Sequence, residues 1–364
     1  MTAAEIVEEG CASIVQALGS KLHCLKGKTF LVTGGAGFLG SWFLHALAYA
    51  NDHVLLADPC QIVCVDNFIR GHPRWLGALA DKSYTTIINT DIVRMTPSSL
   101  PRFNYAVHAA SIASPSFYRK FPIETMDANV LGLRLLLDAC VEREVEVESV
   151  LFMSSSEIYG DPPPERIPTD EDFWGHVSCV GPRACYDESK RYGETLCVNF
   201  HRVHGVPVKV ARPFNNYGPG LSINDGRVIP DLARNVLAKE DIVLFSDGSP
   251  TRTFCYAADA VKGYLLVLLS DYNGEAFNIG SDDPEISMME LANLFTQIVD
   301  EEFSIKVRVR HEQHPEPKYL TDNPQRRCPN IRKAREKLGF SARYKLEEGL
   351  RKTLRWYSLE GNGG

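Results

Sequence analysis

The residues best suited to chemistry in this sequence are Tyr186 and Lys190, the two ends of the segment YDESK (186–190). Residues four apart in a helix lie on one face, one turn from each other. A lysine ammonium beside a phenol favours the phenolate, and it should lower the pKa of Tyr186 from its ordinary value of about 10. Such a tyrosine can remove a hydroxyl proton while the neighbouring carbon loses a hydride. We therefore predict Tyr186 and Lys190 as catalytic residues of hydride chemistry.

A hydroxyl that could assist this tyrosine lies upstream, in the segment MSSSEIYG (153–160). The segment follows an apolar run that is typical of a strand, and a doubly wound fold binds its ligands at strand ends. Ser155 can there bridge a substrate hydroxyl and Tyr186. A YxxxK pattern alone is common by chance and also describes surface residues. Its combination with a strand-end serine and with the glycine turn described next favours the catalytic interpretation.

A glycine-rich turn, TGGAGFLG (33–40), follows an apolar run and opens a helical pattern. Its glycines Gly34, Gly37 and Gly40 have GxxGxxG spacing. Glycine has no Cβ, so the backbone can turn tightly and approach a diphosphate, which then faces the N–H groups at the start of the helix. The turn predicts a dinucleotide site with contacts from Gly34, Gly37, Phe38 and Leu39.

The ends of later strands supply the other expected cofactor contacts. Asp66 and Asn67 end the second apolar run. A carboxylate there accepts hydrogen bonds from ribose hydroxyls and repels a 2′-phosphate, which favours NAD over NADP. We interpret His108, at the end of a later strand, as structural. Further contacts are expected from residues at the ends of the next two strands, which are Asp91, Ile92, Ala109, Ala110 and Ser111.

Strand-like and helical patterns alternate through the first part of the chain, and these elements must position the residues above. The strand-like runs are 28–33, 62–66, 104–108, 148–153 and 207–212. Helical patterns lie between them, notably 38–50, 124–143 and 183–204. Alternation with nearly continuous apolar strands predicts an α/β fold with a Rossmann-type doubly wound parallel sheet.

The regularity weakens beyond about residue 213. A strand-like run at 242–245 and helical patterns at 257–270, 287–300 and 345–358 predict a smaller C-terminal substrate-binding lobe, interleaved with the sheet. We therefore divide the chain into a helical lead-in (1–27), an NAD-binding domain (28–212) and a mainly substrate-binding region (213–364). A long loop over 161–185 is rich in Pro, Asp and Glu, and loops of this length are usually functional.

Composition excludes several classes of protein. The 364 residues are 44% hydrophobic, which is ample for a full core, and the formal charge of −7 disfavours binding to nucleic acid or an anionic membrane. The ten cysteines contain no CxxC pair and no cluster with zinc spacing, so we expect no metal and a reducing compartment. No apolar run approaches the roughly 20 residues that cross a bilayer, and the start lacks the basic region of a signal peptide. We expect a cytoplasmic protein.

From about Lys28 to Tyr357 the sequence resembles the extended short-chain dehydrogenase/reductase superfamily, and within it the UDP-glucuronate decarboxylases. The segments that carry the resemblance are SSSEIYGDP (154–162), EDFWGHVSCVGPRACYDESKR (171–191), NDGRVIP (224–230), TRTFCY (251–256), NIGSDDPEIS (278–287) and NPQRRCPNIRKA (323–334). The stretch GPRACYDESKR is far more diagnostic than YxxxK. The resemblance implies NAD as cofactor and a UDP-sugar as substrate.

The residues after the strand-end serine separate the decarboxylases from similar enzymes. The 4,6-dehydratases carry Asp-Glu there, and the Asp protonates the leaving C6 hydroxyl, whereas this chain has Ser156, a poor acid. Simple 4-epimerases usually have a small residue where Glu157 stands. The Ser-Glu pair implies that Tyr186 takes the C4 hydroxyl proton as C4 passes its hydride to NAD. The resulting 4-keto sugar loses carbon dioxide, and NADH reduces C4 to give UDP-xylose.

The resemblance also implies roles for residues that no spacing singles out. Glu157 would orient the sugar ring and handle its C5 proton, and Arg252 would lie near the substrate carboxylate. A cofactor contact is implied for Arg212. The implied substrate contacts are Tyr118, Ser156, Asn215, Arg227, Arg252, Tyr256 and Arg327. Gly220 stands where the family usually has an arginine, a departure that concerns the contacts to the diphosphate.

Three alternatives stay open at this point. The first is a nucleotide-hexose 4,6-dehydratase of the dTDP-glucose type, and the second is a decarboxylase that releases the UDP-4-keto-pentose. The third is a non-catalytic NAD-binding scaffold, although such proteins usually lose the tyrosine or lysine that this chain keeps. The resemblance further implies a homodimer in which helices 124–143 and 183–204 form a four-helix bundle between subunits.

Overall fold

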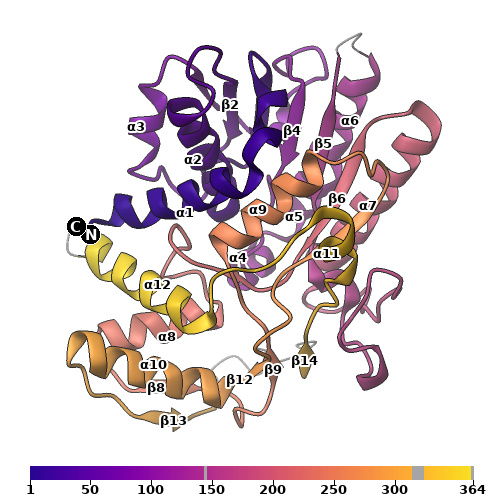
Figure 1. The fold of residues 1–364 in the computed structure, drawn as a ribbon. Helices are drawn as coiled ribbons and strands as arrows, with labels where there is room; N and C mark the ends of the chain where they lie inside the picture. The colour runs from indigo at the N-terminus through magenta and orange to yellow at the C-terminus, as the bar shows by residue number, and fades with distance from the viewer. Residues whose placement is uncertain (143–145, 314–323, 362–364) are drawn as a thin grey trace.

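A seven-stranded parallel sheet forms the centre of the computed structural model, which describes residues 1–142, 146–313 and 324–361 (Figure 1). The strands are β1 (Thr29–Thr33), β2 (Gln61–Asp66), β3 (Thr85–Asn89), β4 (Tyr105–His108), β5 (Ser149–Met153), β6 (Val208–Pro213) and β11 (Ala276–Ile279). Their order is β11-β6-β5-β4-β1-β2-β3, and all neighbouring pairs are parallel. The direction of winding reverses between β1 and β4, so the predicted Rossmann-type α/β fold is confirmed.

Helices cover both faces of this sheet because successive strand residues point to opposite sides. In β1, Phe30 and Val32 belong to the core beneath α2 (Phe38–His53) and α9 (Ala257–Leu268). Leu31, between them, belongs to the opposite core beneath α6 (Leu133–Glu142) and α7 (Ala184–His204). All three side chains are fully buried. Both faces are therefore closed, and ligands must approach the sheet at an edge.

The single helix predicted over 124–143 is three elements, and residue 143 lies outside the described residues. They are α5 (Pro122–Asp127), a π-helical turn η3 (Ala128–Gly132) and α6. The turn contacts the sheet and α7: Nε2 of His108 bonds the carbonyl oxygen of Ala128 at 3.1 Å, and Asn129 donates to Ser189 Oγ at 2.9 Å. The other ring nitrogen of His108 bonds Thr33 Oγ1 at 2.9 Å, which fits its predicted structural role.

The C-terminal region forms a second lobe, at the bottom of Figure 1, around α8 (Val228–Leu237) and α10 (Met288–Phe303). β11 and α9 come from the same part of the sequence, but β11 belongs to the central sheet and α9 packs against it. The sheet domain and the C-terminal lobe are therefore interleaved along the chain. The short strands of this region are β7 (Asn216–Tyr217), β8 (Ile242–Leu244), β9 (Thr251–Arg252), β10 (Cys255–Tyr256), β12 (Ile286–Ser287), β13 (Val309–His311) and β14 (Arg326–Arg327). Its remaining helices are α11 (Arg332–Leu338) and α12 (Leu346–Gly361).

Helix α1 (Ala3–Leu18) precedes the sheet and packs against α2, α9 and α12. It begins with a capping box, in which Thr2 Oγ1 accepts from the Glu5 N–H at 3.2 Å and the Glu5 carboxylate accepts from the Thr2 N–H at 2.8 Å. The remaining short helices are η1 (Gly19–Leu25), α3 (Leu76–Ala80), η2 (Ile92–Arg94), α4 (Pro115–Lys120), η4 (Ser156–Tyr159) and η5 (Pro164–Arg166). Across the described residues, no helix is long and apolar enough to cross a membrane.

Candidate active site

A cleft of about 670 Å³ opens at the carboxyl ends of the central strands. Gly34 after β1, Ala109 after β4, Met153 at the end of β5 and Pro213 at the end of β6 line it. Further lining residues come from the loop after β2, from α4 and α7, from the loop before α8 and from the C-terminal lobe. This edge, next to the reversal of strand order, is where open parallel sheets bind their ligands.

The turn after β1 has no room for side chains. Gly34 has a positive φ of 73°, and a Cβ added there would lie 2.5 Å from the backbone nitrogen of Ala110. A Cβ on Gly40 would lie 2.1 Å from the carbonyl oxygen of Gly34. Gly37 is the N-cap of α2 and lines the cleft. The start of α2 therefore presents backbone N–H groups that an anion such as a diphosphate can approach closely.

Asp66 is held beside this turn by two backbone N–H groups. Its carboxylate accepts from Ala36 at 2.9 Å and from Phe68 at 2.8 Å. Burial raises the pKa of Asp66, although both of these hydrogen bonds act to lower it. Asn67 donates to the Asp91 carboxylate at 3.0 Å, which joins the ends of β2 and β3. The predicted ribose acceptor thus has a fixed position next to the glycine turn.

Tyr186, Ser155 and Lys190 meet in the cleft as predicted from their spacing. The ring of Tyr186 stacks on that of Tyr118, with centroids 5.3 Å apart and planes 15° apart. The Ser155 hydroxyl is hydrogen-bonded to the Tyr186 phenol. The Lys190 ammonium lies 5.6 Å from the centroid of the Tyr186 ring and donates to the carbonyl oxygen of Met153 at 2.7 Å. The strand-end hydroxyl, the phenol and the ammonium are therefore held together by β5 and α7.

Burial moves the pKa values of the two catalytic candidates in opposite directions. It raises the pKa of Tyr186 to about 12, against the hydrogen bond with Ser155, which lowers it. It lowers the pKa of Lys190 to about 7. Desolvation disfavours the charged form of each group, which is why the directions differ. The pKa of Tyr186 is thus shifted opposite to the direction predicted from a neighbouring ammonium.

Glu157, at the start of η4, binds two arginines in the cleft. Arg327 donates to its two carboxylate oxygens at 2.5 and 2.6 Å, and Arg183 forms an ion pair with the same carboxylate. Burial alone would raise the pKa of Glu157, but the charges of Arg183 and Arg327 outweigh it and hold the pKa at about 2. Two guanidinium groups share one carboxylate, so this corner of the cleft is positively charged and suits an anion.

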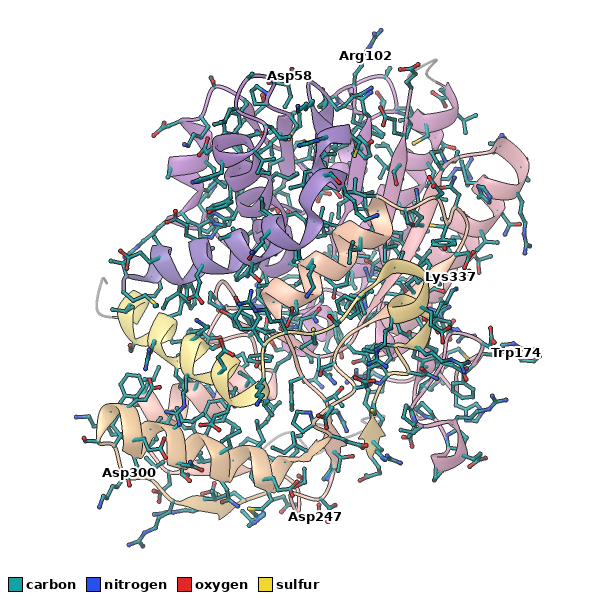
Figure 2. The ribbon with its side chains drawn as sticks, viewed as in Figure 1. Asp58, Arg102, Trp174, Asp247, Asp300 and Lys337 are labelled. Atoms are coloured by element: carbon teal, nitrogen blue, oxygen red, sulfur yellow. The ribbon has the colours of Figure 1, made fainter. Side chains whose placement is uncertain are left out.

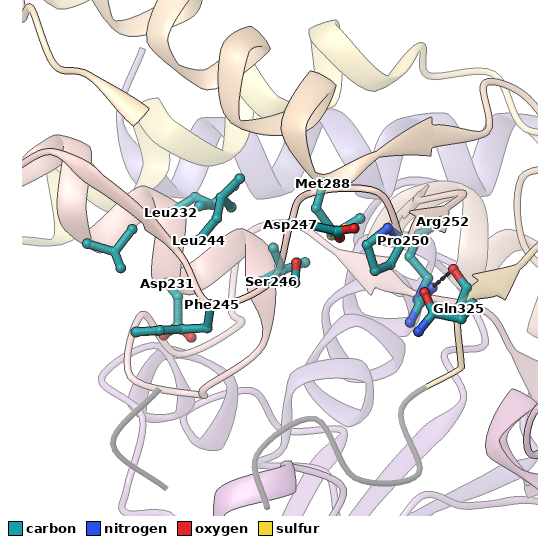
Figure 3. Close-up of a pocket in the computed structure, with 12 residues that line it drawn as sticks. Asp231, Leu232, Leu244, Phe245, Ser246, Asp247, Pro250, Arg252, Met288 and Gln325 are labelled. Carbon is teal, nitrogen blue, oxygen red and sulfur yellow. Dashed lines mark hydrogen bonds between the residues drawn. The ribbon is translucent and has the colours of Figure 1, made fainter. Parts of the chain in front are cut away.

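Arg252 lies where the cleft meets a second, smaller cavity of about 330 Å³ (Figure 3). It is buried and donates to the carbonyl oxygens of Thr251 at 2.7 Å and Pro324 at 2.5 Å. Burial, together with the nearby charge of Arg327, lowers the pKa of Arg252 to about 9. Leu244 and Gln325 are among the residues that line the smaller cavity.

Most residues predicted from the sequence line the main cleft. The cofactor candidates, the catalytic candidates and the substrate candidates all contribute to this set. Its members are Gly34, Gly37, Phe38, Leu39, Ala109, Ser111, Tyr118, Ser155, Ser156, Glu157, Tyr186, Lys190, Asn215, Arg227, Arg252 and Arg327.

Other predicted residues lie outside that lining. Arg212 is buried behind the strand ends, where it pairs with Glu194 at 2.7 Å and donates to Tyr159 Oη at 2.7 Å. Tyr256 is buried with its ring against Trp42, at a centroid distance of 6.3 Å. The structure therefore places both in supporting positions behind the cleft. The remaining members of this group are Asp66, Asn67, Asp91, Ile92 and Ala110.

Three arginines that line the cleft were not among the residues predicted from the sequence, and they are Arg70, Arg119 and Arg183. Arg183 lies three residues before Tyr186 within the diagnostic stretch GPRACYDESKR, so its spacing did carry a signal. Arg70 lies in the loop after β2 and reaches the cleft through the conformation of that loop. No spacing in the sequence indicates this position.

Comparisons with known proteins agree with this geometry. The family model described as the NAD dependent epimerase/dehydratase family matches residues 30–280. The chain is 37% identical over 337 residues to UDP-glucuronic acid decarboxylase 1 of Danio rerio, covering 92% of this chain and 73% of that protein. It is 36% identical over 323 residues to UDP-glucuronic acid decarboxylase 6 of Arabidopsis thaliana, covering 88% of this chain and 86% of that protein.

Solved structures of similar fold include enzymes with related ligands. A dTDP-glucose 4,6-dehydratase of Streptomyces venezuelae, solved with NAD, gives a TM-score of 0.76 at 25% identity and covers 92% of this chain and 98% of its own. A UDP-glucose 4-epimerase of Thermotoga maritima, solved with UDP-glucose, gives a TM-score of 0.75 at 26% identity and covers 90% of this chain and 98% of its own.

Proposed function

Since this chain belongs to the NAD dependent epimerase/dehydratase family, we propose that it decarboxylates UDP-glucuronate to UDP-xylose through a 4-keto sugar. The observation that carries the proposal is the cluster of Glu157, Arg183 and Arg327, which lines the same cleft as Tyr186. A positively charged corner there fits a sugar whose carboxylate lies close to the hydroxyl that is oxidised. The decarboxylases of fish and plant, at 37% and 36% identity, support the same reaction.

The residues of the cofactor half fit NAD. A Cβ at Gly34 or Gly40 would overlap backbone atoms, so the bare backbone there can lie against a diphosphate. The Asp66 carboxylate at the end of β2 suits ribose hydroxyls and repels a 2′-phosphate. Bound NAD supplies the hydride acceptor and donor for C4 and a positive charge near the phenol. We assign this half to the proposed domain 28–212 and the sugar mainly to 213–364.

Tyr186 is the proposed base for the C4 hydroxyl. Its hydrogen bond with Ser155 lets the two oxygens hold one sugar hydroxyl between them. With a pKa of about 12, the phenol gives up its proton only when positive charge lies nearby. Lys190 supplies such charge while it is protonated, and its own pKa of about 7 means that this help is lost as the pH rises.

The carboxylate leaves as carbon dioxide once C4 is a ketone, because the electron pair of the C5–C6 bond can then pass to the C4 oxygen. The resulting enolate takes up a proton at C5 before C4 is reduced. Ser155 and Tyr186 lie where they can stabilise that oxyanion. Arg183, Arg252 and Arg327 are the proposed partners of the sugar carboxylate. Glu157, with its pKa of about 2, is suited to holding the arginines rather than to donating a proton. Ser156, which also lines the cleft, offers no acid strong enough to expel the C6 hydroxyl of a hexose.

We further propose a homodimer formed through α5, η3, α6 and α7. These elements pack against one another and leave large apolar side chains exposed on their outer side. Ile123 is 59% exposed, Leu131 52%, Tyr192 51% and Val203 71%. Tyr192 and Val203 are separated by about three helical turns and share one face of α7. Exposed apolar residues that gather on one side mark protein interfaces.

We propose that the protein acts in the cytoplasm. All ten cysteines are free in the structure, and six of them are buried. Burial raises the pKa of the Cys197 thiol far above its ordinary value, which keeps this thiol protonated and unreactive. Unpaired thiols in these numbers are typical of a reducing compartment.

The test incubates the purified protein with UDP-glucuronate and NAD and measures carbon dioxide release together with the mass of the nucleotide sugar. A UDP-pentose product supports the proposal, and a product two hydrogens lighter indicates that the 4-keto sugar is released. Tyr186→Phe should lower the rate roughly a thousandfold, while the control Tyr272→Phe, just before the amino end of β11 and outside the cleft lining, should keep it. Water loss from a dTDP- or UDP-hexose without carbon dioxide release would establish a 4,6-dehydratase instead. NAD binding without any turnover would indicate a scaffold.

A further inference from the structure

Two arginines from opposite sides of the cleft share one buried carboxylate. Asp225, in the loop before α8, is 3% exposed. Arg227 forms an ion pair with one of its oxygens, and Arg70 Nη2 lies 3.5 Å from the other. All three residues line the main cleft. The loop after β2 and the loop before α8, which are 155 residues apart in the sequence, therefore meet over the ligand space.

The conformation of the loop after β2 directs Arg70 across the cleft. The chain reverses at Phe68, which has a positive φ of 54°, and Asp66 and Asn67 fix the turn by accepting from the N–H groups of Phe68 and Ile69. The Arg70 guanidinium then lies 3.9 Å above the centroid of the Phe117 ring. This contact holds the planar group in place without using its N–H donors.

The loop that carries Asp225 is also fixed. Ser114 Oγ donates to the carbonyl oxygen of Asp225 at 2.6 Å, and Ser116 Oγ lies 3.4 Å from the same oxygen. Arg227 continues from it toward the start of α2, with its guanidinium 5.9 Å from the centroid of the Phe38 ring. The two guanidinium groups thus lie on fixed supports on either side of one carboxylate.

The cluster of Arg70, Asp225 and Arg227, which lines the cleft, carries a net positive charge. Two guanidinium groups and one carboxylate leave a net charge of one positive unit. Among the described residues, the only protein acceptor for either arginine is Asp225, so their other N–H groups remain available. Guanidinium groups with free donors are suited to phosphate oxygens, which they can bind in pairs. Gly220 lines the same cleft and contributes no charge.

We propose that Arg70 is a binding residue for the diphosphate of the nucleotide sugar, acting with Arg227 from the opposite wall. The inference rests on the proposed function for the class of substrate, a nucleoside diphosphate sugar. Under this proposal Arg70, which belongs to the cofactor half of the protein, contacts the substrate.

The test compares Arg70→Gln, Arg70→Lys and the control Arg102→Gln by calorimetric titration with UDP and with uridine, each protein loaded with NAD. Arg102 is an exposed arginine just before the amino end of β4, at the edge of the sheet opposite the cleft (Figure 2). Arg70→Gln should weaken UDP binding about tenfold and leave uridine binding unchanged, because one charged contact to phosphate is lost. Arg70→Lys should lose less affinity for UDP, and Arg102→Gln should bind UDP as tightly as the wild type.

Kinetics give a second readout. Arg70→Gln should raise KM for UDP-glucuronate about tenfold and change kcat less than twofold. Equal weakening of UDP and uridine would overturn the proposal, since the defect would then not concern the diphosphate. Weaker NAD binding with unchanged UDP binding would assign Arg70 to the cofactor instead. If the wild type binds another nucleoside diphosphate in place of UDP, the proposed substrate fails, and the same variants still test Arg70 with that nucleotide. Binding of no nucleoside diphosphate would refute both.

Discussion

Glu157 shows how a buried carboxylate stays charged through its neighbours. Its carboxylate joins Arg183, one turn from Tyr186, to Arg327 in β14, which is 170 residues away in the sequence. Breaking a buried ion pair by removing one partner typically costs about 3–5 kcal/mol, because the other charge is left without compensation. Here the buried Arg327 and the partly buried Arg183 depend on the same carboxylate. The cluster is therefore expected to contribute to stability as well as to substrate binding.

Glu157→Gln should reduce the free energy of unfolding by about 3 kcal/mol at pH 7. The folded-state pKa of about 2 lies below the ordinary value of 4.5, so the contribution of Glu157 is fully present above about pH 4.5 and is lost as the pH falls toward 2. The difference in the free energy of unfolding between Glu157→Gln and the wild type should therefore narrow as the pH falls from about 4.5 toward 2. Urea denaturation at several pH values and one protein concentration measures it.

Glu165→Gln is the matched control, because Glu165 is an exposed glutamate in η5. The free energy of unfolding of this variant should stay within about 0.5 kcal/mol of the wild-type value at every pH. A stability gap for Glu157→Gln that stays constant from pH 7 to pH 3 would contradict the role of its ionised carboxylate.

Helix α1 connects the start of the chain to both halves of the protein. It packs against α2 and α9 on the sheet and against α12, where Glu9 pairs with Lys352 at 2.7 Å. Gly10 faces the indole of Trp42, whose Nε1 donates to the carbonyl oxygen of Pro219 at 2.8 Å. Pro219 precedes Gly220, which lines the cleft. The packing of α1 thus supports a loop of the candidate active site.

Gly10→Ala should destabilise the protein by about 1–3 kcal/mol. The added Cβ would lie 2.6 Å from a ring carbon of Trp42, so the helix or the indole must shift. Gly77→Ala in α3 is the control, since nothing lies within 4 Å of a Cβ there. That substitution should be neutral or stabilising by up to about 1 kcal/mol, because alanine favours helix. Thermal melting of both variants at equal concentration measures the difference, and similar shifts in both would refute the close packing of α1.

Four of the large apolar residues that remain exposed in the described part of the chain lie on α5, η3 and α7, the side proposed for the dimer. They are Ile123, Leu131, Tyr192 and Val203. The same elements position the site from within, because Asn129 of η3 bonds Ser189 of α7, between Tyr186 and Lys190. Association through this side would therefore stabilise the helix that carries both catalytic candidates.

Leu131→Glu should convert a dimer at micromolar concentration into a monomer, because a carboxylate would be buried without a partner in the interface. Sedimentation velocity measures the change. Leu56→Glu serves as the control, since Leu56 is 70% exposed and lies beyond the end of α2, on another side of the fold. A wild type that sediments as a monomer, or a Leu131→Glu variant as dimeric as Leu56→Glu, would rule out this interface.

Local rules in the sequence were sufficient for the fold class, the glycine turn and the Tyr186–Lys190 pair. Strand alternation, GxxGxxG spacing and four-residue helical spacing are each short-range patterns, and the structure places their residues at one sheet edge. Such patterns could not predict the π-helical turn at 128–132, since it depends on contacts with His108 and Ser189. Periodicity predicted one helix there.

The charges and their partners required the tertiary structure. Glu157 with Arg327, and Arg70 with Asp225, pair across 170 and 155 residues, and no spacing encodes such contacts. The pKa of Tyr186 rises rather than falls because burial, which depends on everything packed around the ring, outweighs the hydrogen bond with Ser155. Sequence thus determined which groups are present and which strand or helix carries them. Their desolvation and their ion pairs arise only when distant segments pack together.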